Sequence, residues 1–233
     1  LFEGAEQAEG TAVIIDVYRA FTTASIAFLR GVDKILFVSE VSEALELRDG
    51  GLADICIGEE RGIMPNGFDF GNSPYQLSNA DVEGKTVVQR TSAGTRGVEA
   101  ASMASDIYVA ALINSSATAW TILQDGPDLV TLIAMGDEGR NRTDEDEQCA
   151  LYIRNLLEGN EVDIESIKSL VLAGSQSRKY ENSLTPHFHP RDREIALRIN
   201  ECPFAIRVQR DEGLLIAQPI YPPETTVDSI NFH

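Results

Sequence analysis

Short apolar runs rich in β-branched residues alternate with helical patterns through the first two-thirds of this chain. The expected strands are residues 11–16, 34–38, 53–57, 85–89, 107–111 and 129–135. The expected helices between them are residues 22–30, 42–49, 95–103, 116–124 and 144–158. Alternation of this kind is typical of βαβ units, in which helices cover both faces of a mostly parallel sheet. The sequence therefore predicts an α/β fold.

The last third of the chain has a different pattern. Residues 164–179 and 190–200 are expected to be helical, whereas residues 204–210 and 214–220 are expected to be strands. The Asp-Glu-Gly turn between those two strands indicates a β-hairpin. We expect the hairpin to extend one edge of the sheet and so to make the sheet mixed. Residues 225–233 are expected to form a loose tail.

Length and composition limit the class of protein. A chain of 233 residues with 43% hydrophobic content can bury a substantial core. We expect one α/β domain over residues 1–224, or two closely packed halves with a break near residues 125–143. A homo-oligomer is compatible with the sequence, which does not specify it.

The charge and the cysteines indicate where such a chain works. The net charge of −18 repels nucleic acid and anionic membrane surfaces, so neither is an expected partner. No apolar run approaches the roughly 20 residues of a membrane span. Cys56, Cys149 and Cys202 are widely separated and are expected to be buried thiols in a reducing cytoplasm.

Most of the unusual polar clusters follow directly after an expected strand. They are Asp16 with Arg19, then Gly58-Glu-Glu-Arg-Gly62, Arg90-Thr-Ser-Ala-Gly-Thr95, Leu112-Ile-Asn-Ser-Ser116 and Gly136-Asp137. In open α/β sheets, ligands bind in the crevice at the carboxyl ends of the strands. The regular placement of these clusters therefore predicts one shared active-site edge.

The first cluster joins a carboxylate, a fixed positive charge and hydroxyl residues at a strand-to-helix turn. Asp16 is a candidate metal ligand, Arg19 supplies the charge, and Thr22 and Thr23 stand where a helix opens. Together with free helix amides, these groups can hold a phosphate ester beside a divalent cation. The alternatives are that Asp16 is only a helix N-cap and that Arg19 belongs to a surface ion pair.

Residues 91–95 form a small-residue turn that can cradle phosphate oxygens. Thr91, Ser92 and Thr95 offer hydroxyl groups, and Gly94 permits a tight backbone. The alternative is a tight connection with no ligand, for which glycine is needed on backbone grounds alone. The turn lacks the lysine of a Walker A loop and the spacing of a dinucleotide fingerprint, which disfavours both kinds of nucleotide enzyme.

Three further acidic positions are candidate metal ligands. Glu59 and Glu60 are adjacent, so at most one of them is expected to point inward, and both can simply be solvated. Asp146 lies in an acidic first helical turn, where carboxylates are often matched to the helix dipole, but it can also face the active-site edge. Residues 187–189, His-Phe-His, have metal-ligand spacing but are expected to form a loop between two prolines.

Residues 67–74, Gly-Phe-Asp-Phe-Gly-Asn-Ser-Pro, form the most distinctive loop. Its glycines and its proline predict an irregular backbone, whereas its two phenylalanines indicate that it packs against the core. Asp69 can face the site as a metal ligand or cap a turn. Asn72 and Ser73 can bind a ligand or serve turn geometry only.

Taken in order, these motifs resemble those of the 2-phosphosulfolactate phosphatase (ComB) family. Residues 16–23, Asp-Val-Tyr-Arg-Ala-Phe-Thr-Thr, resemble its D-V-x-R-A signature. Residues 58–62 resemble its G-E-x-x-G region, and residues 67–74 resemble its G-F-D-x-G-N-S-P loop. Residues 91–95 are similar to its T-T-N-G-T turn, Asn114 stands at a family asparagine, and residues 136–150 are similar to its last acidic stretch.

This resemblance implies an α/β/α layered fold and a Mg²⁺-dependent hydrolase of a small, anionic hydroxy-acid phosphate, within coenzyme M biosynthesis. Asp16, with Glu59 or Glu60 and Asp146, would hold the metal. Arg19 and the amides of residues 91–95 would neutralise the phosphate. The remaining implied roles are phosphate or water orientation by Asn114, and binding of a second anionic group by Arg61 and Arg90.

Three classes of function stay open at this point. A metal-dependent phosphatase would release phosphate from phosphorylated hydroxy acids. A non-catalytic sensor on the same scaffold would bind them with Mg²⁺ without turnover. A dinucleotide-dependent oxidoreductase is disfavoured because the glycine fingerprint is missing. Direct attack by water and a covalent intermediate on Asp16 are both compatible with the sequence.

Overall fold

Nine strands form one sheet in residues 1–222, the part of the chain that this computed structural model describes. The strands are β1 (Thr11–Ile15), β2 (Lys34–Val38), β3 (Ile55–Gly58), β4 (Phe70–Gly71), β5 (Thr86–Arg90), β6 (Asp106–Ala110), β7 (Val130–Ala134), β8 (Ala205–Asp211) and β9 (Leu214–Ile220). Their order is β4-β3-β5-β2-β9-β8-β6-β1-β7. Five neighbouring pairs are parallel and three are antiparallel, so the sheet is mixed and mostly parallel.

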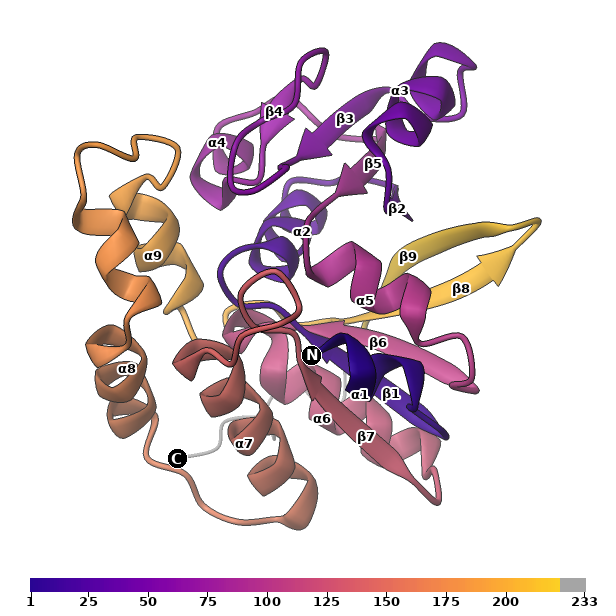
Figure 1. Cartoon of the computed structure of the whole chain (residues 1–233). Helices are drawn as coiled ribbons and strands as arrows, with labels where there is room; N and C mark the ends of the chain where they lie inside the picture. The colour runs from indigo at the N-terminus through magenta and orange to yellow at the C-terminus, as the bar shows by residue number, and fades with distance from the viewer. Residues whose placement is uncertain (223–233) are drawn as a thin grey trace.

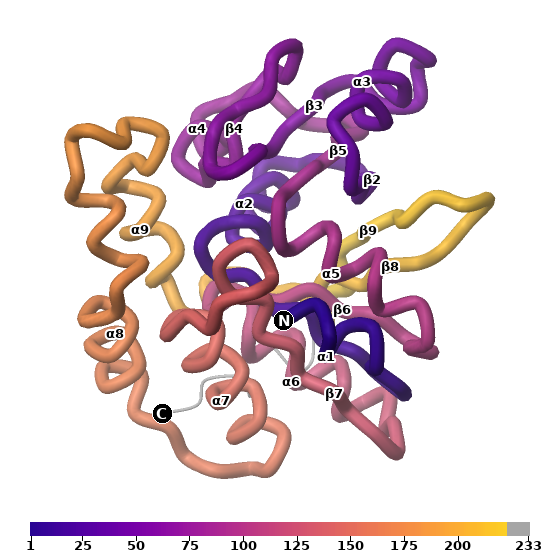
Figure 2. The backbone as a smooth tube through the Cα atoms, viewed as in Figure 1, coloured from indigo at the N-terminus to yellow at the C-terminus, as the bar shows by residue number. Residues whose placement is uncertain are grey.

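The predicted hairpin forms, but its predicted position was wrong. It lies in the middle of the sheet, where β9 pairs with β2 and β8 pairs with β6 (Figure 2). Each strand of the hairpin therefore completes the hydrogen bonds of a parallel group that would otherwise end in an open edge. Ile206 and Ala217 are fully buried, as a central position requires. Glu212 and Gly213 have positive φ, which fits a two-residue hairpin turn.

The central hairpin sets the relative direction of the two parallel groups. Three antiparallel pairings lie between β5 and β1, so the two groups run in opposite senses along the ladder. Neighbouring strands also rotate by roughly 20–25° each, and five such steps separate β5 from β1. The accumulated twist brings the carboxyl ends of both groups together, and a side chain on Gly94, after β5, would touch Asp16, after β1.

Helices cover both faces of the sheet and form the outer layers (Figure 1). They are α1 (Phe2–Glu6), α2 (Ala20–Leu29), α3 (Val41–Asp49), α4 (Pro74–Ser78), α5 (Gly94–Ala100), α6 (Ser115–Asp125), α7 (Asp144–Glu158), α8 (Ile164–Ala173) and α9 (Pro190–Ala196), with 3₁₀ turns η1 (Leu112–Asn114) and η2 (Gln176–Glu181). Ile35 and Phe37 belong to the main core, whereas Leu36 packs in a second cluster with Ala44 of α3. The predicted α/β class with layered helices is confirmed.

The two helices predicted in the last third of the chain end earlier than expected, and the helix expected over residues 95–103 ends at Ala100. The helix expected over residues 164–179 stops at Ala173, because Gly174 turns into an extended conformation and η2 follows. A Cβ on Gly174 would lie 2.9 Å from Oδ2 of Asp144, so this position requires close approach to α7. The helix expected over residues 190–200 ends at Ala196, and Asn200 has a positive φ. The short elements α1, β4 and α4 were not predicted.

The described residues also bear on the expectations about membrane spans, cysteines and domains. No helix within residues 1–222 is long and apolar enough to cross a bilayer. The three cysteines are free and buried. The stretch considered as a domain break contains β7, which pairs with β1, and the number of domains stays a prediction. The tail expected over residues 225–233 lies outside the described residues.

The central hairpin gives a stability prediction. We expect Ile206→Ala to lower the free energy of unfolding by about 2–5 kcal/mol, because it leaves a cavity between the two parallel groups. Gln209→Ala on the same strand is the matched control and should change it by less than about 0.5 kcal/mol, because Gln209 is exposed. Urea unfolding measures both. Equal, small effects would show that the hairpin does not stabilise the sheet.

Candidate active site

A cavity of 230 Å³ lies where the carboxyl ends of the two parallel groups meet. The segments that directly follow β1, β3, β5 and β7 contribute Asp16, Glu59, Ser92 and Gly136 to its lining. The beginning of α7 contributes a second group of carboxylates, and Gln176, Lys179, Tyr180 and Phe188 complete the lining from the last third of the chain. The cavity therefore collects side chains from the clusters that follow four of the strands.

The chain after β5 packs tightly against Asp16. A Cβ on Gly94 would lie 2.7 Å from Cβ of Ala20 and 3.0 Å from Oδ2 of Asp16. Only glycine fits this contact without displacing the first turn of α2. The backbone of residues 91–95 thus approaches the Asp16 carboxylate directly.

The Asp16 carboxylate is buried and is held by backbone amides. Its side chain follows β1 at the start of α2, and Oδ1 accepts a hydrogen bond from the amide of Ala20 at 3.1 Å. The amide of Gly94 is a second backbone donor to this carboxylate. Burial raises the pKa of Asp16 well above its usual value, and the nearby negative charges of Asp146 and Glu59 raise it further.

Asp146 joins three segments of the site. Its Oδ1 accepts a hydrogen bond from the amide of Val17 at 2.8 Å, and its Oδ2 accepts one from the amide of Gly136 at 2.7 Å. Burial raises the pKa of Asp146 to about 8, and the neighbouring Glu145 adds to the effect. Burial likewise raises the pKa of Glu145 to about 7, with a smaller contribution from Asp16. Asp146 therefore lines the cavity, which is one of the two alternatives that the sequence left open.

In the part of the chain that the structure describes, no cationic side chain is an ion-pair partner of these carboxylates. Within residues 1–222, no lysine, arginine or histidine forms an ion pair with Asp16, Glu59, Glu145 or Asp146. Burial of unpaired negative charge is strongly unfavourable, so protons or a bound cation must compensate it. This donor set fits Mg²⁺, which prefers carboxylate oxygens.

The described residues do not form a complete metal cage. No three Asp, Glu, His or Cys side chains among residues 1–222 converge closely enough to enclose an ion. Mg²⁺ is often held by only one or two carboxylates and keeps waters or substrate oxygens as its other ligands. The arrangement therefore fits a magnesium ion that binds together with its substrate.

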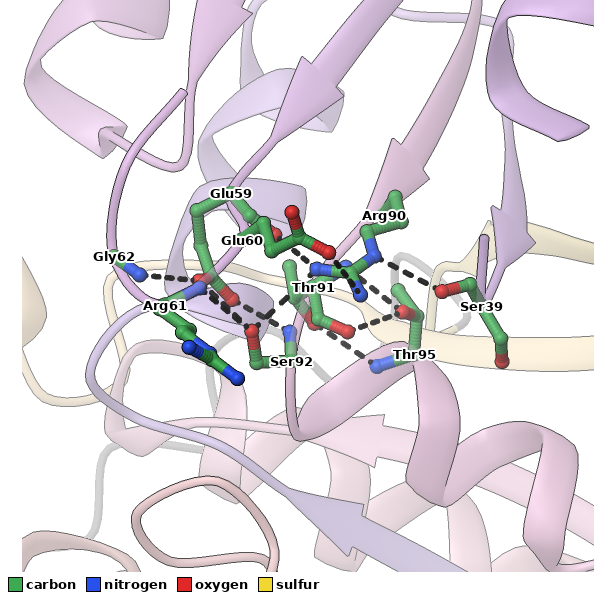
Figure 3. Close-up of polar contacts among 9 residues, drawn as sticks. All are labelled: Ser39, Glu59, Glu60, Arg61, Gly62, Arg90, Thr91, Ser92 and Thr95. Atoms are coloured by element: carbon green, nitrogen blue, oxygen red, sulfur yellow. Dashed lines mark hydrogen bonds and ion pairs between the residues drawn. The ribbon is translucent and has the colours of Figure 1, made fainter. Parts of the chain in front are cut away.

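Glu59 holds together the loops that follow β3 and β5 (Figure 3). Its Oε1 accepts a hydrogen bond from the Ser92 amide at 2.6 Å. Its Oε2 accepts hydrogen bonds from the Gly62 amide at 2.6 Å and from the Ser92 hydroxyl at 3.0 Å. A carboxylate offers about four acceptor positions, so one remains free for a ligand. Glu59 thus holds two loops in place and still faces the cavity.

Arg90 and Glu60 lie next to these two loops but do not line the cavity. Arg90 donates to the carbonyl oxygens of Ser39 at 2.9 Å and Glu59 at 2.7 Å (Figure 3). Glu60 is largely exposed and pairs with Arg90 at 3.5 Å. Of the two adjacent glutamates, only Glu59 points inward, as the sequence predicted for the pair.

Arg19 lines the cavity but is also part of a buried ion pair. Its Nη1 lies 2.8 Å from Oδ2 of Asp192, and both side chains are at most 3% exposed. The other oxygen of Asp192 accepts hydrogen bonds from the Ser73 hydroxyl at 2.6 Å and the Tyr75 amide at 3.0 Å. Asp192 therefore connects the turn after β1 to the 67–74 loop. The alternative of a surface ion pair for Arg19 does not apply.

Several other predicted site residues serve local structure. Thr91 and Thr95 bond each other's backbone amides at the start of α5 (Figure 3). Asn114 accepts from the Ala111 amide and donates to the Val109 carbonyl, which closes the turn after β6. None of these three side chains lines the cavity, so none of them is a proposed ligand contact.

Some of the remaining predicted residues line the cavity and others do not. Arg61, Asn72 and Ser92 line the cavity, whereas Ser73 caps α4. Thr22 and Thr23 are buried in α2, outside the cavity lining. Asp69 is partly exposed, accepts a hydrogen bond from the Cys56 amide and lies 3.5 Å from Arg48, also outside the lining. Asp69 thus binds the amide of a residue in β3, and the described hydrogen bonds support neither the metal-ligand nor the turn-capping alternative.

Sequence reasoning missed five residues at or behind the cavity. They are Glu145, Lys179, Tyr180, Phe188 and Asp192. Glu145 belongs to an acidic run from which only its neighbour was chosen. The other four lie in the last third of the chain, where no strand end marks a functional edge.

The raised pKa values predict a pH-dependent stability. Asp16 and Asp146 bind protons more strongly when folded, so the metal-free protein should lose stability as the pH rises from about 4, the pKa of an unfolded aspartate, through about 8. Mg²⁺ should replace those protons and raise Tm more at pH 8 than at pH 5. Thermal unfolding with and without Mg²⁺ measures this, with Asp146→Asn as the variant that flattens the dependence. A pH-independent Mg²⁺ effect would contradict the assignment.

Comparison with known proteins identifies the family. The family model described as 2-phosphosulpholactate phosphatase matches residues 2–193. A probable 2-phosphosulfolactate phosphatase of Bacillus subtilis (strain 168) is 30% identical over 206 residues, which cover 85% of this chain and 87% of that protein. A protein of the same name from Caldicellulosiruptor saccharolyticus is 34% identical over 181 residues, or 76% of this chain and 73% of that protein. The chain belongs to the 2-phosphosulfolactate phosphatase family.

Proposed function

We propose that the chain is a Mg²⁺-dependent phosphatase that hydrolyses a small hydroxy-acid phosphate, with 2-phosphosulfolactate as the first candidate substrate. The observation that carries the proposal is a set of four buried carboxylates, next to Arg19 at the end of β1, that form no ion pair with a cationic side chain among residues 1–222. The reaction converts 2-phosphosulfolactate and water to sulfolactate and phosphate. It would belong to coenzyme M biosynthesis, and the buried free cysteines support a cytoplasmic location.

Asp16 and Asp146 are the proposed magnesium ligands, and Glu59 lies near enough to add negative charge without being a third direct ligand. When bound, Mg²⁺ would neutralise phosphate oxygens and the charge that develops on them. The backbone hydrogen bonds to both aspartates fix their carboxylates before any ion arrives. Arranging the donors in advance reduces the reorganisation required during the reaction.

Arg19 is the proposed partner of the phosphate on the protein side. Its Nη1 is occupied by Asp192 and the His187 carbonyl, but its Nη2 and Nε make no hydrogen bond within the described residues. These free N–H groups can donate to phosphate oxygens as charge develops there. Asp192 keeps the guanidinium in position and so acts through Arg19.

Hydrolysis forms a bond from a water oxygen to phosphorus and breaks the phosphorus–oxygen bond to the substrate carbon chain. The departing alkoxide then needs a proton. Glu145 is the proposed donor because burial raises the pKa of its carboxyl above the usual value and so favours the protonated form. It lies next to Asp146 and lines the same cavity.

The proposal predicts that Asp16→Asn abolishes Mg²⁺-dependent phosphate release, lowering kcat by at least about a thousandfold. The fold should persist, because the neutral amide removes charge repulsion from a buried site whose pKa is raised. Phosphate release from a panel of phosphorylated hydroxy acids, with and without Mg²⁺, measures the activity.

Asp81→Asn is the matched control, because it removes the same charge from an exposed position and should leave activity unchanged. Near-normal release by Asp16→Asn would contradict the assignment. Binding of the esters by the wild-type chain without any release would instead support a metabolite sensor.

A further inference from the structure

Four hydrogen-bond donors of the cavity lining lie around one aromatic ring. The Arg19 guanidinium lies 4.9 Å from the centroid of the Phe188 ring, and Nζ of Lys179 lies 5.6 Å from it. The Tyr180 ring lies 5.6 Å from the same centroid. A Cβ on Gly62 would lie 2.9 Å from Phe188, which places the Arg61 backbone beside this ring. We call Arg19, Arg61, Lys179 and Tyr180 the donor wall.

The donor wall contains a buried hydroxyl group that has no partner. Tyr180 is 2% exposed, and its hydroxyl makes no hydrogen bond within the described residues. Oδ1 of Asn72 and Oγ1 of Thr143, which line the same cavity, also lack a partner among the described residues. An unsatisfied buried polar group is destabilising. Three such groups at one cavity indicate that a ligand or water completes them.

The donor wall is suited to a negative ligand. Burial raises the pKa of Tyr180 well above its usual value, so its hydroxyl keeps its proton and can donate. The Arg61 guanidinium makes no hydrogen bond or ion pair within the described residues, and Figure 3 shows it without any dashed line. Lys179 lies 3.2 Å from Asp137 and is 38% exposed, so only one of its three donor positions is occupied.

The cavity therefore has two chemically different sides. Asp16, Glu145 and Asp146 form a side that attracts a cation, whereas the donor wall attracts an anion. A lone phosphate held with its metal would occupy the first side and leave the second side unsatisfied. A substrate with an additional anionic group would use both sides.

We propose that Tyr180, Lys179 and Arg61 bind a second anionic group of the substrate, a carboxylate or sulfonate, and so determine specificity for phosphorylated acids over neutral phosphate esters. This inference rests on the proposed phosphatase function and adds the residues that select the substrate class. Arg19 belongs to the donor wall and is also the proposed phosphate partner. Tyr180 is the decisive member, since its hydroxyl has no partner among residues 1–222.

Two phosphate esters that differ in one group test the proposal. Phospholactate carries a carboxylate where isopropyl phosphate carries a methyl group. The wild-type chain should favour phospholactate in kcat/KM. Tyr180→Phe should lower kcat/KM for phospholactate about tenfold or more, as expected for a lost hydrogen bond to a charged group, and mainly through KM. It should change kcat/KM for isopropyl phosphate by less than about twofold.

Tyr152→Phe is the matched control, because Tyr152 is also 2% exposed but bonds Asn200 outside the cavity lining. It should leave the preference for phospholactate unchanged. Lys179→Met should weaken the preference in the same direction as Tyr180→Phe. An equal loss for both esters in Tyr180→Phe, or no loss for either, would overturn the proposal.

The same esters separate this inference from the proposed function. If neither ester is hydrolysed, the phosphatase proposal fails, and calorimetric titration with Mg²⁺ measures their binding instead. Tighter binding of phospholactate by the wild-type chain, lost in Tyr180→Phe, would still support the anion subsite. Equal affinity of the wild-type chain for the two esters would overturn it.

Discussion

The site depends on buried negative charge that the protein itself does not neutralise. Asp16 and Asp146 receive backbone amides from the turns after β1 and β7 and from the start of α2. These hydrogen bonds connect α7 to the sheet and orient both carboxylates toward one cavity. Because burial of unpaired charge is strongly unfavourable, protons or a bound cation must neutralise these carboxylates.

The central hairpin determines which segments can meet at that cavity. It joins two parallel groups in opposite senses, and the twist of the sheet then brings their carboxyl ends together. Gly94 makes the contact between the two groups, because any side chain there would collide with Ala20 and Asp16. The C-terminal strands, which line no part of the cavity, are therefore needed to assemble it.

Sequence patterns predicted the repetitive part of this fold well. Strands and helices with clear periodicity lie close to their expected positions, and β2, β9 and α7 match them residue for residue. The hairpin position could not be predicted, because the same apolar pattern suits a central or an edge strand. Short elements such as β4 and α4 depend on tertiary contacts, among them the bonds of Asp192 to Ser73 and Tyr75.

The residues of the candidate site also fall into two groups, those that the sequence could reveal and those that it could not. Residues placed directly after parallel strands, such as Asp16 and Glu59, could be found from sequence because strand ends mark a functional edge. Arg90 and Asn114 have the same placement, yet their side chains satisfy nearby carbonyl or amide groups instead. Tyr180 could not be found, because it reaches the cavity from a 3₁₀ turn far along the chain.

The central claim is that these carboxylates hold a divalent cation at the end of β1. Crystals grown with Mn²⁺ in place of Mg²⁺ test it most directly, through an anomalous difference map. The account predicts one strong peak at coordination distance, about 2.1 Å, from a carboxylate oxygen of Asp16 and one of Asp146. A strong peak elsewhere, or none here at Mn²⁺ concentrations that saturate phosphate release, would contradict it.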